Sequence, residues 1–216
     1  MAKISFIIPY PSIAGLIQST IREQTDGEWE YETIMNVGVQ PIIHREIKSD
    51  VIIARGVTAV ALRRKLPDIP VIDLPVTGYD ILRAVKSCLE LFKVRTFGVV
   101  GSREMIYGVK SIESIMEVAL ETIEVNDEGD AKPSLAKLKD QNINTIIGGA
   151  MSCGIARQLG MNSLFIESGR EAIYSALREA KRVVAVRRRE QERAEQFRTI
   201  LDYADEGIIA VDGQAR

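Results

Sequence analysis

The sequence predicts an α/β protein with two similar lobes, each built on a parallel sheet covered by helices. Short apolar runs rich in β-branched residues, such as Val51–Ala54, alternate with helical segments along the chain. The strand–loop–helix–strand unit at residues 50–84 recurs at residues 144–176. The chain has 216 residues, 46% of them hydrophobic, which is enough for two small lobes with real cores.

A short motif marks the repeat. Thr77-Gly78-Tyr79-Asp80 opens a helix in the first copy, and Ser168-Gly169-Arg170-Glu171 lies in the matching place in the second. An acid three residues after a hydroxyl is typical of a capping box, so we expect both acids to act mainly as helix caps. An internal duplication explains the match, and a chance likeness of two βαβ units is the alternative.

The first lobe is expected at residues 1–93. An apolar strand at 3–9 precedes a helix at 12–23, which Ser12 can cap and which carries an apolar face. The remaining elements follow from the same alternation of patterns. They are strand 29–37, helix 39–48, strand 51–54, helix 57–66, strand 71–74 and helix 79–92, the last of which closes the lobe.

The second lobe is expected at residues 94–180 and repeats the alternation. Its elements are strand 96–101, helix 107–120, strand 122–125, helix 134–140, strand 145–147, helix 151–159 and strand 164–166.

A long helix is expected from residue 168 to residue 201, because no glycine or proline lies between Gly169 and Gly207. Its part at 181–201 carries charge on most sides, which predicts a linker or signalling helix that leaves the globular body. Residues 202–216 contain one apolar run between two glycines, which predicts a turn, a strand and a turn. A lone strand cannot fold by itself, so we expect a further domain to begin here.

Composition excludes several classes of protein. A net charge of −2 argues against a chain built mainly to grip nucleic acid or an anionic membrane. No apolar stretch is long enough to span a bilayer, and the N-terminal apolar run is a strand without a signal-peptide cleavage site. Cys88 and Cys153 lie far apart and form no metal motif or disulfide framework. We expect a soluble cytoplasmic protein with free thiols and no metal or cofactor.

Ligands of parallel α/β sheets bind outside the carboxyl ends of the strands. The residues expected there are hydroxyls, glycines and arginines, and several of them begin helices, whose free N–H groups attract anions. We therefore expect a cleft for an anionic small molecule, a carboxylate, bridging the lobes and favouring a closed state. Its candidate ligand-binding residues are Ser12, Arg55, Gly56, Thr58, Thr77, Ser102, Arg103, Gly149, Ser152 and Ser168.

Two kinds of residue in this set have a second interpretation. A guanidinium can clasp a carboxylate through two parallel hydrogen bonds, but Arg55 can also form a structural ion pair with Asp50, Asp73 or Asp80. For Ser12, Ser102 and Ser168 we favour helix capping alone.

The sequence favours a protein that is not an enzyme. His44 is the only histidine and falls outside the strand ends, so no Ser–His–acid arrangement is expected. The glycine loops do not match nucleotide fingerprints. The alternative is a cofactor-independent racemase-like enzyme with one cysteine in each lobe. Cys153 fits that pattern, whereas Cys88 falls in the middle of a helix.

The run at residues 50–59, Asp-Val-Ile-Ile-Ala-Arg-Gly-Val-Thr-Ala, resembles the amino-terminal sensor domain of the propionate-catabolism activators. So do Ile69-Pro70-Val71-Ile72-Asp73, Gly78-Tyr79-Asp80-Ile81-Leu82 and the motif at Ser168. The similarity covers about residues 4–180. Residues 200–212 also look like the first strand of a PAS domain. Val57 stands where the family has a second glycine, which leaves the identity of the ligand open.

This resemblance implies a role in the regulation of bacterial transcription. Members are enhancer-binding regulators that work with sigma-54 RNA polymerase, and their sensor domain binds a small metabolite, 2-methylcitrate, to control a downstream ATPase module. The resemblance therefore implies, as partners, a carboxylate effector, downstream PAS, ATPase and DNA-binding domains, and sigma-54 RNA polymerase through those domains. The charged helix could also pair with a second copy, so we expect a homo-oligomer.

Overall fold

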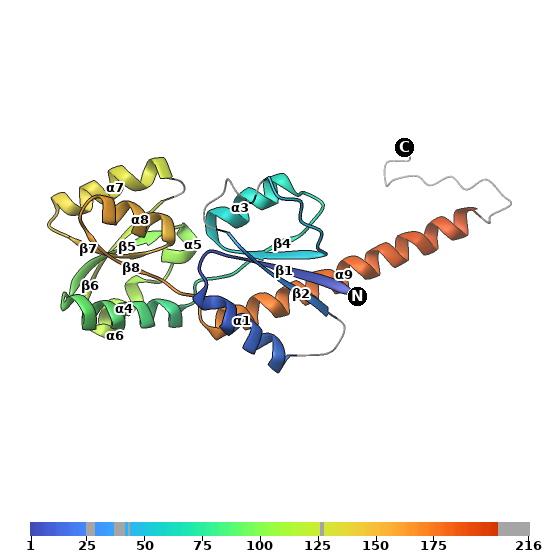
Figure 1. The fold of residues 1–216 in the computed structure, drawn as a ribbon, viewed down its shortest axis with the longest axis horizontal. Helices are drawn as coiled ribbons and strands as arrows, with labels where there is room; N and C mark the ends of the chain where they lie inside the picture. Colours follow the sequence, from blue (N-terminus) through green and yellow to red (C-terminus); the bar gives the residue numbers. More distant parts are fainter. Residues whose placement is uncertain (25–28, 37–41, 43, 126–127, 203–216) are drawn as a thin grey trace, which may run out of the picture. The chain divides into compact units, whose positions relative to one another are not determined.

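The computed structural model describes residues 1–24, 29–36, 42, 44–125 and 128–202 (Figure 1). The chain divides into two compact units, Met1–Ala180 and Lys181–Arg216. Among the described residues, no helix combines the length and apolar character that a membrane span requires. The predicted strand between Gly207 and Gly213, and with it the expected PAS-like segment beyond residue 202, lies outside the described residues.

The first unit contains two parallel sheets with the same topology. In the described part of the chain, the first sheet has the order β2-β1-β3-β4 and the second the order β6-β5-β7-β8. Every pairing is parallel. The strands are β1 (Ala2–Ile8), β2 (Trp29–Met35), β3 (Val51–Ala54), β4 (Val71–Asp73), β5 (Thr96–Gly101), β6 (Ala119–Glu124), β7 (Thr145–Gly148) and β8 (Asn162–Phe165).

Strand register supports the repeat seen in the sequence. Ile52 pairs with Ser5 of the neighbouring β1, and Ile146, its counterpart, pairs with Gly98 of β5. Strands β3 and β7 are buried along their whole length, as central strands of parallel sheets should be. The predicted α/β fold with two similar lobes and a long last helix is therefore confirmed.

Most predicted helices lie within a few residues of their expected bounds. The described helices are α1 (Ser12–Glu23), α3 (Gly56–Lys65), α4 (Gly78–Phe92), α5 (Arg103–Ile106), α6 (Lys110–Met116), α7 (Glu128–Asp140), α8 (Ala150–Gln158) and α9 (Arg170–Asp202).

Three predicted elements differ from the structure. The helix expected at 107–120 is shorter in the structure. Gly108 has a φ of 78°, so α6 begins only at Lys110, and β6 already begins at Ala119; the short α5 precedes the expected range. Helix α7 begins six residues before the predicted 134 and holds Pro133 inside it. Of the helix expected at 39–48, residues 39–41 and 43 lie outside the described residues, and His44–Lys48 form a turn and irregular chain.

The chain changes lobe before α4 and again before α9. The buried face of α4, including Val85 and Cys88, packs into one cluster with Phe97 and Val99 of the second sheet. The expectation that this helix closes the first lobe is therefore wrong, because an apolar helix face does not specify which sheet it will cover. Figure 1 shows α4 beneath the second sheet.

The first turns of α9 return to the first lobe. Arg170 pairs with Glu23 at the end of α1, and the turns around Ala176 face β4 across a groove. Ile173 and Leu177 are fully buried there. Each lobe is thus completed by a helix that follows a strand of the other lobe, and the two crossing segments, residues 74–77 and 166–169, lie before these helices.

Candidate functional site

Asp80 joins the two crossing segments. It is only 1% exposed. Its Oδ2 accepts hydrogen bonds from the backbone N–H of Thr77 at 2.7 Å and from the Thr77 hydroxyl at 2.8 Å. Its Oδ1 accepts from the backbone N–H of Gly169 at 2.7 Å and from Arg83. The predicted capping box of α4 is confirmed, and the same carboxylate also holds the chain just before α9.

Arg55 reaches from the first lobe to the second crossing segment. It ends β3 with an extended backbone, and Gly56 follows with a φ of 56°, which only glycine adopts at little cost. The Arg55 Nη1 donates to the carbonyl of Ile166 at 2.8 Å and to the hydroxyl of Ser168 at 3.1 Å. Its guanidinium carbon lies 5.4 Å from the centre of the Phe165 ring, a cation–π distance.

The Arg55 side chain is buried without a carboxylate partner among the described residues. Its Nη2 is buried and has no hydrogen-bond partner there. Loss of hydration lowers the pKa of the guanidinium, which means that burial disfavours its charge. The ion pair considered from the sequence is not formed. Instead, Asp50 accepts from the backbone of Lys3, Asp73 pairs with Arg63, and Asp80 holds the crossing segments.

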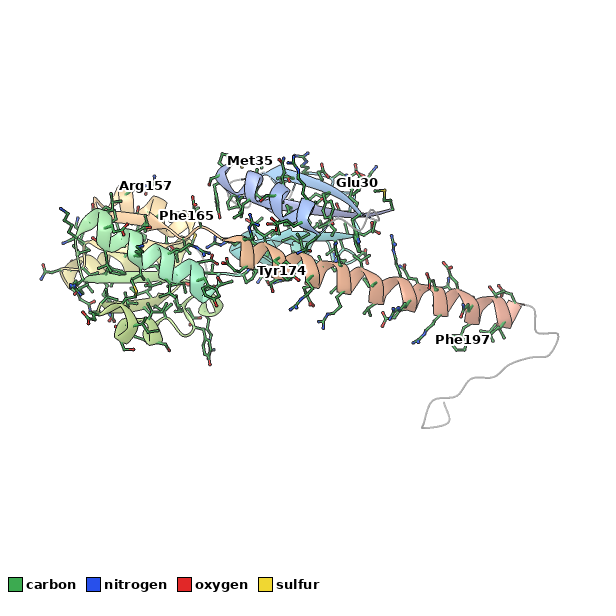
Figure 2. All side chains as sticks on the ribbon, turned by 90° about the horizontal axis from the view of Figure 1, so that it is seen from below. Glu30, Met35, Arg157, Phe165, Tyr174 and Phe197 are labelled. Atoms are coloured by element: carbon green, nitrogen blue, oxygen red, sulfur yellow. The ribbon has the colours of Figure 1, made fainter. Side chains whose placement is uncertain are left out.

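Tyr10 completes this cluster, and the sequence analysis did not single it out. It lies in the loop after β1, and its ring meets Phe165 edge-on at a centroid distance of 4.7 Å. Its phenol oxygen accepts the backbone N–H of Ser168 at 2.8 Å. Burial raises the pKa of the phenol, so it keeps its proton. The sequence signal that could have found it is an aromatic residue at a strand end in each lobe, Tyr10 after β1 and Phe165 at the end of β8. Figure 2 labels Phe165, on the chain that leads from β8 to α9.

Ser12, Arg55 and, through Asp80, Thr77 of the first lobe reach the second crossing segment, which contains Ser168 of the second lobe. Ser12 is the first residue of α1, not its cap, and its hydroxyl donates to Glu167 at 3.2 Å. Ser168 is 3% exposed, and its hydroxyl is bound by Arg55. Thr77 reaches this segment through Asp80. Thr58 lies on α3, partly buried, after Gly56.

The predicted residues of the second lobe form no such cluster. Ser102 occupies the N-cap position of α5, but its side chain makes no capping bond, so the capping role is wrong here as it is for Ser12. Gly149 is the N-cap of α8, and Ser152 is buried beside the end of β7. Arg103 is exposed. Within the described residues, no hydrogen bond or ion pair links these four to Arg55.

A groove lies away from these residues. It has a volume of about 370 Å³ and lies between β4 and the first turns of α9. Val71 and Pro75 line one side and Ala176 the other. None of the predicted ligand-binding residues lines it, so the groove and the Arg55 cluster are separate features of the first unit.

The two thiols do not have the environment of catalytic cysteines. A reactive thiol needs a lowered pKa, because the thiolate is the nucleophile. Burial instead raises the pKa of Cys88 to about 11 and raises the pKa of Cys153. Cys88 lies in the apolar core of the second lobe, and the Cys153 thiol contacts the carbonyl of Gly148. In the part of the chain that the structure describes, no group of three potential ligands is placed to hold a metal ion.

The comparison with solved structures found the following similarities. An NtrC family transcriptional regulator from Clostridium acetobutylicum is 23% identical, with 86% of this chain and 98% of that chain covered and a TM-score of 0.72. The transcription regulator CcpA of Lactococcus lactis is 10% identical, with 86% and 92% covered and a TM-score of 0.42. An aspartate racemase homologue from Pyrococcus horikoshii OT3 is 13% identical, with 84% and 100% covered and a TM-score of 0.29, too low to support a functional argument.

The family assignment comes from the sequence itself. The sequence model described as propionate catabolism activator matches residues 32–190, which include β3, Arg55 and the second crossing segment. The match spans most of both lobes and the first turns of α9. This chain therefore belongs to the propionate catabolism activator family of regulatory domains.

Proposed function

We propose that this chain is the ligand-sensing domain of a sigma-54-dependent bacterial transcriptional activator, and that it binds a small carboxylate beside Arg55. The observation that carries the proposal is the buried Arg55 Nη2, which has no hydrogen-bond partner among the described residues. A buried donor of a charged group that lacks an acceptor is costly in a folded protein, and an anionic ligand that accepts from Nη2 would remove that cost.

The chemistry of the cluster favours an anion over a neutral ligand. The Arg55 Nη1 donates to Ile166 and Ser168, which fixes the plane of the guanidinium and leaves Nη2 as a donor that is already positioned. Phe165 lies against the guanidinium, which reduces its contact with water and strengthens its attraction to a charge. Hydrogen bonds from a guanidinium to a carboxylate are among the stronger ones in proteins.

The same contacts suggest how binding is read out. Arg55 and Tyr10 hold Ser168, two residues before the start of α9. A ligand that repositions the guanidinium changes the contacts at the root of this helix, which is continuous from Arg170 to Asp202. Such a ligand shifts a conformational equilibrium only by its differential affinity for the two states, commonly about 1–3 kcal/mol.

The family supports the wider context of the proposal. The family is described as that of a propionate catabolism activator, and we place the protein in the bacterial cytoplasm. We place PAS-type, ATPase and DNA-binding modules downstream of this domain in the same protein, acting on sigma-54 RNA polymerase, and we expect the protein to be a homo-oligomer. The cleft residues of the second lobe, Ser102, Arg103, Gly149 and Ser152, would face the same ligand in a closed state.

Thermal unfolding of the full chain against citrate, 2-methylcitrate, succinate and malate tests the proposal. A ligand at a hundredfold its Kd should add about 2.7 kcal/mol to the free energy of unfolding. Arg55→Met should abolish this gain, because it removes the Nη2 donor and the positive charge, together with the Nη1 bonds to Ile166 and Ser168. Arg64→Met, which removes an exposed arginine from the helix that follows Arg55, should keep it. A flat response of the unmodified chain to all four acids would overturn the carboxylate proposal.

A further inference from the structure

We propose that Tyr10 determines ligand specificity in the Arg55 site, because its phenol O–H and the Arg55 Nη2 together bind the two oxygens of one carboxylate group. This inference rests on the proposed function and adds a second donor from a different loop of the same lobe. Tyr10 lies after β1 and Arg55 after β3, and these two strands pair directly.

Shared anchors hold Tyr10 and Arg55 beside each other. The backbone N–H of Ser168 donates to the Tyr10 oxygen at 2.8 Å, and the Ser168 hydroxyl accepts from Arg55 at 3.1 Å. Phe165 takes the guanidinium on its face and the Tyr10 ring at 4.7 Å, with the two rings 76° apart. Ser168 in the second crossing segment and Phe165 just before this segment therefore hold both donors in place, as preorganised binding requires.

The position of the phenol proton follows from what surrounds the oxygen. A phenol oxygen carries one proton and also accepts hydrogen bonds. Here the oxygen already accepts from Ser168 and lies in the field of the Arg55 cation. The Ser168 hydroxyl and the Glu167 carboxylate also lie near this oxygen. Among the described residues, no hydrogen bond is recorded with the Tyr10 hydroxyl as its donor, and the Arg55 Nη2 has no partner.

Two neighbouring donors from Tyr10 and Arg55 match the needs of a carboxylate. Its two oxygens offer acceptor sites on both sides of one planar group, and one takes a charge-assisted bond from arginine. Burial raises the pKa of Tyr10, so the phenol remains a donor at neutral pH. A ligand lacking one oxygen of the carboxylate, such as a primary amide, would present an N–H group to one of two donors and lose affinity.

The test is isothermal titration of the full chain with each of the four acids, using unmodified protein, Tyr10→Phe and Tyr174→Phe. Tyr10→Phe keeps the ring on Phe165 and removes only the hydroxyl. We expect it to weaken acid binding about tenfold or more, because it deletes one hydrogen bond to a charged group. Tyr174→Phe, which alters a tyrosine that is 50% exposed on α9, should bind as the unmodified chain does.

A purely structural role for Tyr10 predicts a different result. It would lower the thermal midpoint of Tyr10→Phe, through loss of the acceptor for Ser168, while Kd stayed unchanged. Unchanged affinity in Tyr10→Phe, with affinity lost in Arg55→Met, would overturn the role of Tyr10 alone. Absence of binding by the unmodified chain would overturn the proposed function and this inference together. If the unmodified chain binds the monoamide more weakly than the acid, and the variants do not distinguish the two, the carboxylate is the group that both donors recognise.

Discussion

The two crossing segments carry the same sequence motif but make different contacts. In the first, the side chains of Thr77 and Asp80 each accept from the other residue's backbone N–H, so these N–H groups at the start of α4 are bonded locally. In the second, the Ser168 hydroxyl accepts a hydrogen bond from Arg55, and the Ser168 N–H donates to Tyr10. The Gly169 N–H donates to Asp80. The acid of the second motif, Glu171, pairs with Arg83 of α4.

This difference separates a fixed junction from an adjustable one. A capping box depends only on residues within one turn, so no other part of the molecule can easily alter it. The root of α9 is held by side chains from β1, β3 and α4, so a change at any of them reaches it. The two junctions share a motif, but only the first has a capping box, and the second is held by the contacts that the proposed ligand at Arg55 would modify.

The largest expected effect separates the two acids. Asp80→Ala should lower the free energy of unfolding by roughly 3 kcal/mol, because a buried carboxylate with four hydrogen bonds leaves its backbone donors unpaired. Glu171→Ala should change it by less than about 0.5 kcal/mol, since its side chain is 48% exposed and makes one ion pair with Arg83. Chemical denaturation of both variants measures the difference.

Equal losses in the two variants would contradict the comparison, because they would mean that both acids cap their helices alike. Asp80→Asn is a useful control. It keeps the side-chain shape and one acceptor oxygen, so it should fall between Asp80→Ala and the unmodified chain.

The fold was predictable because each central strand carries its signal locally. Val51–Ala54 and Thr145–Gly148 are short, β-branched and buried on both faces, and the sequence shows all of this. The exchange of α4 and α9 between lobes was not predictable, because a helix face like that of Val85 and Cys88 fits either sheet. The late start of α6 depends on the backbone angle at Gly108, which the surrounding helical pattern hides.

The site was predictable only in part, for a similar reason. Strand-end logic found Arg55 and Ser168, whose contact joins residues 113 positions apart. It missed Tyr10 because an aromatic residue after a strand looks like part of the core. The position of the Tyr10 ring depends on its contact with Phe165 of the other lobe, which no local pattern shows. It also treated Asp80 as a cap, which is correct, but no local pattern reveals the bond from Gly169.

A smaller effect distinguishes the two glycines of the motif. A Cβ at Gly169 would overlap the guanidinium of Arg83, whereas a Cβ at Gly78 meets nothing within 4 Å. Gly169→Ala should therefore cost roughly 1–2 kcal/mol as Arg83 leaves Asp80. Gly78→Ala should be neutral or stabilise α4 by up to about 1 kcal/mol. Thermal unfolding compares the two, and a loss at Gly78 that matched the loss at Gly169 would show that the two junctions are equally crowded.

The smallest change in stability, and the sharpest test of the comparison, comes from the two hydroxyls. Thr77→Val removes a helix cap and should cost about 1 kcal/mol while leaving the Kd for the bound acid unchanged. Ser168→Ala removes one of two acceptors that orient Arg55, so it should cost less than about 0.5 kcal/mol but weaken acid binding severalfold. Denaturation and titration on the same samples give both quantities. The opposite pattern, with binding lost in Thr77→Val and stability lost in Ser168→Ala, would assign the adjustable junction to α4 instead of α9.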